Sequence, residues 1–148
     1  MNTSKKTNED GYSLLEILVV LAIMAVLASV VAPRLFSQVD KAKITAAKSQ
    51  VKALRLALDA YRLDSGRYPS AEEGLSLLVT KPSGDGSWFG PYLDGDLPVD
   101  PWEAPYVYVP SRLDQNGSSL APRVISLGSD GLEGGTGDAA DISSSLNR

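Results

Sequence analysis

Cysteine and histidine are both absent from the 148 residues of this sequence. Without cysteine the chain can form no disulfide and offers no thiol nucleophile. Without histidine it lacks the commonest general base, the usual zinc ligand and every histidine-based catalytic triad. An enzyme made from this chain would have to work with carboxylates, lysine or hydroxyl groups alone. We therefore do not expect an enzyme.

A surplus of positive charge is also missing. The chain carries 14 Lys and Arg against 18 Asp and Glu, which gives a formal net charge of −4. Nucleic-acid-binding proteins need a basic surface to neutralise phosphates, so no DNA or RNA partner is expected. The length fits one small domain plus a targeting segment.

One long apolar run is present near the N-terminus. Residues 17–33 are apolar except for Ser29, and residues 14–15 extend the run. This length lies at the low end of what a membrane-spanning helix needs. Lys5 and Lys6 precede the run, so the positive-inside rule predicts a cytoplasmic N-terminus and an exported remainder.

An ordinary signal peptide and a plain membrane anchor are the two simpler interpretations of this run. The small-residue cleavage candidate ends at Ala32 and is followed directly by Pro33, which is a poor neighbour for a scissile bond. Glu16 lies just inside the run, although a charge deep in a bilayer costs roughly 2.5–3.5 kcal/mol and somewhat less near an interface. Neither interpretation gives Glu16 a purpose.

The opening of the run contains a specific motif. It consists of Gly11-Tyr12-Ser13-Leu14-Leu15-Glu16. The motif resembles the cleavage site of type IV pilins and pseudopilins, which implies that a prepilin peptidase cuts between Gly11 and Tyr12 and N-methylates Tyr12. Residues 1–11 would be a leader peptide, and residues 12–34 the transmembrane and assembly half of a retained helix. Tyr12 departs from the family's usual phenylalanine but keeps the aromatic ring.

The same resemblance implies assembly roles for Glu16 and Pro33. Glu16, the fifth residue after the cut, would reach the N-terminal amine of Tyr12 in a neighbouring subunit. Two charges that are costly alone would form a pair in the low-dielectric core of a fibre, which favours assembly. Pro33 removes one backbone hydrogen bond. It marks either a simple break between an anchor and a domain or a flexible point that bends when subunits pack.

Beyond Pro33, apolar residues recur at helical spacing. The stripe steps by three and four residues through Ile44, Ala47, Val51, Leu54, Leu58 and Tyr61. Ser65-Gly66 is a suitable stop. We expect residues 35–65 to form the amphipathic, periplasmic half of one long helix that begins near Tyr12.

Residues 66–148 are expected to form a small C-terminal domain. A capped short helix is predicted at residues 70–78. Residues 106–109 alternate like a strand and residues 124–127 suit a second one, and the polar stretch between them favours an antiparallel pair. The expected fold class is α+β, with a small antiparallel sheet packed on the stripe of the long helix.

Three motifs in this domain, at residues 63–75, 100–106 and 126–131, resemble the major pseudopilins of bacterial type II secretion systems. Fibre-forming type IV pilins usually close this region with a disulfide, so the lack of cysteine favours the pseudopilin branch. The resemblance implies a type IV pilin-like fold. It also implies a structural subunit that polymerises into a periplasmic pseudopilus and helps drive folded proteins across the outer membrane.

The resemblance further implies partners and a location. The chain would cross the inner membrane once and place its C-terminal domain in the periplasm. It would form a helical homo-oligomer and meet minor pseudopilins, the prepilin peptidase, the inner-membrane assembly platform and the outer-membrane secretin. The alternatives are a type IV or competence pilin, a minor pseudopilin, or a membrane-anchored enzyme or binding module. An enzyme or binding module would work as a monomer and would not need Glu16.

Residues 127–141 form a glycine-rich loop that suits a metal. Its carboxylates are those of Asp130, Glu133, Asp138 and Asp141. Carboxylates and backbone carbonyls in a flexible loop suit calcium, which takes six to eight oxygen ligands. No nitrogen or sulfur ligand is near, which argues against zinc or copper. On this chemistry alone, a solvated acidic loop without metal is the alternative.

Major pseudopilins bind calcium in this loop, so the resemblance implies calcium here. Asp130 follows the family's Ser-Leu-Gly-x-Asp-Gly pattern, and Asp141 matches the acidic residue that precedes Ile142. The family often has two adjacent aspartates there, whereas this chain has Ala140-Asp141. Asp138 or Glu133 would complete the site.

Backbone oxygens would supply the remaining protein ligands of that site. The expected ones are the carbonyls of Leu127 and Leu132. The ion would tie down a loop with little core of its own, as a disulfide does elsewhere.

Overall fold

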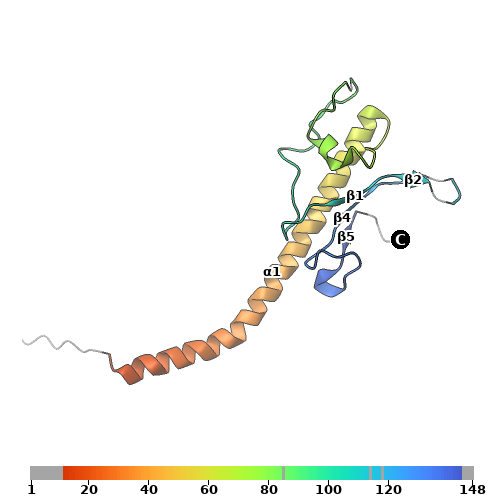
Figure 1. The fold of residues 1–148 in the computed structure, drawn as a ribbon. Coiled ribbons are helices and arrows are strands. Elements are labelled where there is room, and N and C mark those ends of the chain that lie inside the picture. Colours follow the sequence, from red (N-terminus) through yellow and green to blue (C-terminus); the bar gives the residue numbers. More distant parts are fainter. Residues whose placement is uncertain (1–11, 85, 114, 118, 145–148) are drawn as a thin grey trace, which may run out of the picture. The chain divides into compact units, whose positions relative to one another are not determined.

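The computed structural model describes residues 12–84, 86–113, 115–117 and 119–144. Gly11, on the leader side of the expected cut, lies outside these residues. The chain divides into two compact units, residues 1–39 and residues 40–148. Helix α1 (Leu14–Ser65) contributes residues to both units (Figure 1).

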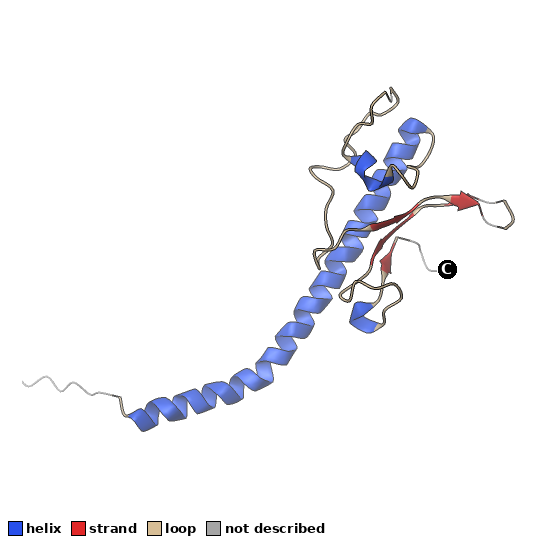
Figure 2. Cartoon of the chain, viewed as in Figure 1, coloured by secondary structure: helices blue, strands red, loops and turns tan. Residues whose placement is uncertain are grey.

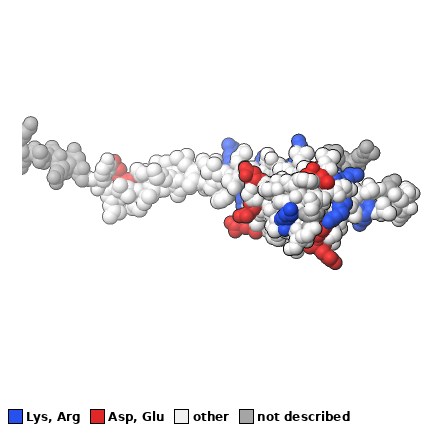
Figure 3. All heavy atoms as spheres, turned by 90° about the horizontal axis from the view of Figure 1, so that it is seen from above, with Lys and Arg blue, Asp and Glu red and all other residues white. Residues whose placement is uncertain are grey.

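The described part of the first unit is the N-terminal portion of α1. The helix starts where the Ile17 amide donates to the Ser13 carbonyl oxygen at 3.2 Å. The one polar side chain of the 17–33 run is satisfied inside the helix, because the Ser29 hydroxyl donates to the Val26 carbonyl oxygen at 2.7 Å. The remaining side chains are apolar, which leaves this stretch of Figure 3 almost entirely white.

The later part of α1 belongs to the second unit and is amphipathic. Five members of the predicted stripe are buried and the sixth, Ile44, is partly buried. The helix ends at Ser65, and the amide of Gly66 donates to the Arg62 carbonyl oxygen at 2.8 Å. Gly66 has a φ of 77°, a conformation that glycine adopts without steric penalty. Both the stripe and the stop are confirmed.

The second unit holds a three-stranded antiparallel sheet in the order β1-β4-β5 (Figure 2). The strands are β1 (Val107–Val109), β4 (Arg123–Ser126) and β5 (Ile142–Ser143). A separate hairpin pairs β2 (Arg112–Leu113) with β3 (Ser119–Leu120). The predicted antiparallel pair is confirmed with shifted bounds, whereas β2, β3 and β5 were not predicted.

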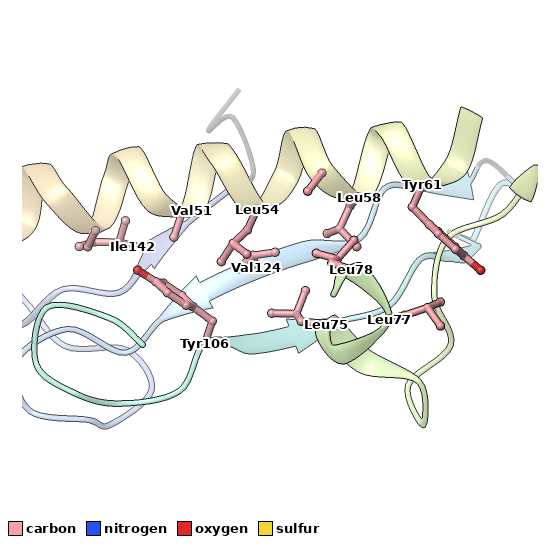
Figure 4. Close-up of a cluster of buried hydrophobic side chains, with 12 residues drawn as sticks. Val51, Leu54, Leu58, Tyr61, Leu75, Leu77, Leu78, Tyr106, Val124 and Ile142 are labelled. Atoms are coloured by element: carbon pink, nitrogen blue, oxygen red, sulfur yellow. The ribbon is translucent and has the colours of Figure 1, made fainter. Parts of the chain in front are cut away.

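The core of the second unit lies between α1 and the elements that follow it (Figure 4). The helix contributes the stripe residues together with Ala57. The facing side chains come from the sheet and from the short 3₁₀ helix η1 (Gly74–Leu78). They are Leu75, Leu77, Leu78, Tyr106, Val124 and Ile142. The predicted α+β arrangement, with the sheet packed on the helical stripe, is confirmed.

A pair of reciprocal hydrogen bonds starts the turn that leads into η1. The Ser70 amide donates to a Glu73 carboxylate oxygen at 2.7 Å, and the Glu73 amide donates to the Ser70 hydroxyl at 3.2 Å. These two bonds have the pattern of a capping box, at the position where the sequence predicts a capped short helix. Residues 71–73 form a turn, however, so the regular helix is shorter than expected and of the 3₁₀ type.

Candidate functional sites: the apolar helix segment and the acidic loop

The first unit exposes an unusual amount of apolar surface. Its helix carries long aliphatic side chains all the way round, and most remain more than half exposed. Helix α1 is the one helix in the described residues that is long and apolar enough to cross a membrane. A contiguous apolar surface of this size marks an interaction site for a membrane or for other chains.

The assembly residues predicted from the sequence lie along this segment. Tyr12 and Glu16 are exposed, and Glu16 forms no ion pair with any described residue. Helix α1 continues through Pro33, so Pro33 is not a break between two separate helices. The segment therefore presents one carboxylate near the start of an otherwise apolar helix.

A buried aspartate, Asp100, holds together the segments that lead to the acidic loop. Its side chain is 2% exposed. One oxygen accepts the amides of Trp102 at 3.0 Å and Ala104 at 2.9 Å, and the other accepts the Ser126 hydroxyl at 2.6 Å. Burial, with the nearby Asp100 charge as a second cause, raises the pKa of Tyr106 to about 12.

Asp100 was not predicted as a structural anchor. The sequence holds a signal for it, because an aspartate that precedes a proline often accepts backbone amides two residues on. The Ser126 hydroxyl in turn accepts the Gly128 amide at 3.3 Å. The entrance to the acidic loop is thus tied to the Asp100 turn.

The acidic loop contains the 3₁₀ helix η2 (Gly137–Ala139) and ends at Asp141. One carboxylate oxygen of Asp141 accepts the Gly134 amide at 3.0 Å. The other oxygen is buried and has no hydrogen-bond partner. A buried carboxylate oxygen without a donor is costly unless a cation or water satisfies it. This oxygen is therefore the best-placed ligand atom in the loop.

The other predicted ligand side chains of the loop are less buried than the Asp141 oxygen. Asp130 is exposed and accepts the Leu132 amide at 3.1 Å. Asp138 is also exposed, and its carbonyl oxygen accepts the Ser129 hydroxyl at 3.5 Å. Leu127 and Glu133 line one open hollow of about 470 Å³ with Asp141.

The described residues contain no group of three or more Asp and Glu side chains gathered as metal ligands. The structure therefore brings Leu127, Glu133 and Asp141 together but does not gather Asp130 and Asp138 with them. Two glycines let the loop fold tightly. A side chain at Gly128 or Gly135 would collide with the Ala139 carbonyl oxygen. The Ala139 carbonyl oxygen thus lies close against the backbone of both glycines.

Two sequence families match the chain. The family described as "Type II secretion system (T2SS), protein G" matches residues 34–145. The family described as "Prokaryotic N-terminal methylation motif" matches residues 6–32. Together the two matches cover most of the second unit and the segment that contains the predicted cleavage motif.

Curated relatives and a solved structure are similar over most of the chain. The type II secretion system core protein G of Pseudomonas aeruginosa is 42% identical over 141 residues, covering 93% of this chain and 96% of that protein. The Vibrio cholerae protein of the same name is 39% identical, covering 93% of this chain and 92% of that protein. The crystal structure of the major pseudopilin of enterohaemorrhagic Escherichia coli matches with a TM-score of 0.53 and 35% identity. It covers 76% of this chain and 94% of that one.

Proposed function

The chain belongs to the protein G family of the type II secretion system, and we propose that it polymerises through its apolar helix segment while calcium stabilises its second unit. It is a structural subunit of a pseudopilus, which assembles with other components of that system. The observation that carries this conclusion is the family match over residues 34–145. It is accompanied by a helix segment whose described aliphatic side chains are largely exposed.

The proposal places the subunit in the inner membrane before assembly, with the second unit in the periplasm. The methylation-motif match over residues 6–32 and the apolar helix support a membrane anchor. In the periplasm the fibre would grow on the inner-membrane assembly platform together with minor pseudopilins. It would help to drive folded proteins through the outer-membrane secretin.

Processing by a prepilin peptidase is the first step of the proposal. The cut falls between Gly11 and Tyr12, and the new amine of Tyr12 is methylated. The methylation-motif match and the exposure of Tyr12 just before the first residue of α1 support this cut. Intact mass and N-terminal sequencing of the mature protein test it. A mature chain that begins at Pro33, or an uncut chain, overturns it.

Glu16 is the proposed partner of that amine in a neighbouring subunit. A methylated amine keeps its positive charge. In a single chain the carboxylate faces an apolar environment alone, whereas in a fibre it gains a counter-charge when the helices pack. Pro33, which removes one hydrogen bond of α1, would supply the adjustable point that this packing needs.

Calcium in the acidic loop is the third element of the proposal. The buried Asp141 oxygen without a partner, the carbonyl-rich loop and the lack of nitrogen or sulfur ligands fit a hard cation. Asp130, Asp141 and the carbonyls of Leu127 and Leu132 would hold the ion, with Asp138 or Glu133 completing the site. The ion would neutralise carboxylates and join distant parts of the loop. The neighbouring Asp100 and Ser126 contacts would then keep that loop against the sheet.

Fibre formation tests the proposed function directly. The full chain is produced together with its assembly machinery, and thin surface fibres are sought by electron microscopy. We expect fibres that contain the mature subunit. A chain that is correctly cut and inserted, but forms no fibre under conditions in which a related subunit does, overturns the proposal.

A further inference from the structure

An open groove of about 900 Å³ lies in the second unit where the β2–β3 hairpin leaves the main sheet. Helix α1 forms one wall, and the segments that connect β1 to β4 form the others. Three arginines line it together with Asp59, two serines and several apolar residues. We call it the arginine groove, and its cations are Arg55, Arg112 and Arg123.

Two of these three arginines have no acidic partner among the residues that the structure describes. Arg55 is engaged, since it pairs with Asp59 at 3.2 Å and donates to the Pro122 carbonyl oxygen at 2.9 Å. Arg112 is exposed and Arg123 is half-buried, and neither forms an ion pair with a described residue. Guanidinium groups beside apolar walls attract carboxylates and bind them in two-point fashion. The groove therefore suits an acidic segment.

The chain itself carries such a segment, the 94–96 tip, in the connection between η1 and β1. Asp94 and Asp96 are exposed there and form no ion pair within the described residues. Gly95 between them has a φ of 94°, which lets the chain bend so that it projects both carboxylates. The exposed Leu97 follows and offers an apolar group beside the charges.

The tip does not reach the groove of its own chain. None of the residues that line the groove comes from the 94–96 tip. In Figure 1 the segment between η1 and β1 runs to the left of α1, whereas the β2–β3 hairpin extends to the right. Two different and complementary surfaces on separate sides of one unit produce head-to-tail contacts. Repeated from copy to copy, such contacts build an open helical fibre wherever the rotation between copies does not close into a ring.

We propose that the 94–96 tip of one subunit binds in the arginine groove of a neighbouring copy, where Asp94 and Asp96 face Arg112 and Arg123. This contact rests on the proposed function of the chain as a fibre subunit. It supplies lateral pairing between second units, separate from the packing of apolar helices. Because the pairs are exposed to solvent at the rim, salt weakens them.

Disulfide trapping tests the contact, since the chain has no cysteine of its own. The full chain that carries Asp96→Cys and Arg112→Cys is assembled with its machinery and oxidised mildly. We expect a ladder of covalently linked trimers and longer chains on a denaturing gel. A chain with Asp96→Cys alone yields dimers at most. Asp96→Cys with Lys81→Cys is the matched control pair and gives no ladder. Normal fibres without a ladder from the first pair overturn the contact.

Charge reversal gives a second readout. We expect Asp94→Lys with Asp96→Lys to lower fibre yield about tenfold, and Arg112→Glu with Arg123→Glu to do the same, since like charges then meet. All four changes together should restore the yield to within about twofold. Lys81→Glu, which changes the net charge by half as much and lies outside the groove, should leave it unchanged. Unaltered melting of each second unit shows that the fold is intact.

The remaining outcomes separate this contact from the proposed function. Both reversals giving normal fibre yield, or four changes that restore nothing, overturn the contact while the fibre role stands. Normal fibres with impaired secretion show that the groove binds another acidic protein, which also overturns the self-contact. Absence of fibres from the unaltered chain counts against the fibre role itself.

Discussion

Leu27 and Leu58 belong to the same helix, yet Leu27 is 61% exposed and Leu58 is 0% exposed. The first unit places its leucines and valines around the whole helix, and in its described residues they stay exposed. The second unit confines similar side chains to one stripe and covers that stripe with its own sheet. The two stretches therefore differ both in how their apolar residues are arranged and in whether the unit itself covers them. In the proposed fibre the first stretch buries its apolar surface on assembly, whereas the second stretch buries its apolar surface on folding.

The largest expected effect comes from removing the carboxylate of Glu16, which lies in the first unit. We expect Glu16→Ala to abolish fibres while membrane insertion and cleavage continue, because the neighbouring amine loses its partner. Insertion should become no harder, since a charge has been removed. Electron microscopy measures the fibres, and mass spectrometry measures the cut. Glu16→Asp is the control that retains the charge and should keep part of the yield. Normal fibres and normal secretion with Glu16→Ala refute the proposed role.

A cavity in the core should affect the second unit alone. Leu58→Ala removes a fully buried side chain, and we expect the free energy of unfolding to fall by about 2–5 kcal/mol. Leu56→Ala, two residues away but 61% exposed, should change it by less than about 0.5 kcal/mol. Urea unfolding of a chain that begins at Ser37 measures both. Equal effects would show that the burial pattern of α1 does not govern stability.

Calcium should stabilise the second unit without involving the apolar segment. A ligand that binds only the folded state adds about 2.7 kcal/mol at a hundredfold excess over its Kd. The melting temperature of the same shortened chain should therefore rise with calcium and fall with chelator, and magnesium should do much less. Asp130→Ala or Asp141→Ala should erase the response, whereas the exposed Asp94→Ala should not.

Asp138→Ala decides whether Asp138 is a ligand. A full loss of the calcium response makes it one, and an unchanged response leaves Glu133 as the candidate. Identical melting of the unaltered second unit in calcium and in chelator excludes a structural calcium ion.

The smallest expected effect comes from the ion pair that fixes the turn after α1. Arg67 donates to both carboxylate oxygens of Glu73 at 2.6 and 2.7 Å, and together with the Ser70 amide it lowers the pKa of Glu73 from 4.5 to about 2. A carboxyl group with a depressed pKa stabilises the fold above its unfolded pKa. That stabilisation disappears as the pH falls through the folded value.

Glu73→Gln should therefore lower the melting temperature at pH 7, by an amount equivalent to less than about 1 kcal/mol. The difference from the unaltered chain should shrink between pH 5 and about pH 2. Glu72→Gln is the matched neighbour, since Glu72 is exposed, and should show neither change. A difference that persists unchanged at pH 2 would assign the effect to lost packing instead.

Helix α1 and the β1–β4 pair were predictable because their signals lie in short stretches of the sequence. A stripe that repeats every three to four residues and a glycine stop need no knowledge of the rest of the fold. Strands β2, β3 and β5 have two residues each and exist only through their partners, so no periodicity can reveal them. The arginine groove was missed for the same reason, since it gathers residues that are distant in sequence.

The acidic loop shows where prediction from the sequence ends. Composition and family resemblance pointed to its aspartates, and their role as ligands stays a prediction. The burial of one Asp141 oxygen depends on how Gly134 and the loop backbone close around it. The anchoring role of Asp100 likewise depends on Ser126, 26 residues away. Such tertiary contacts leave no trace in residue spacing.

The close approach of Gly128 and Gly135 to the Ala139 carbonyl also limits which substitutions this loop tolerates. Any side chain at either position meets backbone, which cannot rotate aside as a side-chain tip can. A saturation scan scored by fibre yield should therefore return only glycine at these two positions. The exposed Glu133 should tolerate many residues by comparison. The strictest limits on substitution in the loop would thus fall on two residues that have no side chain.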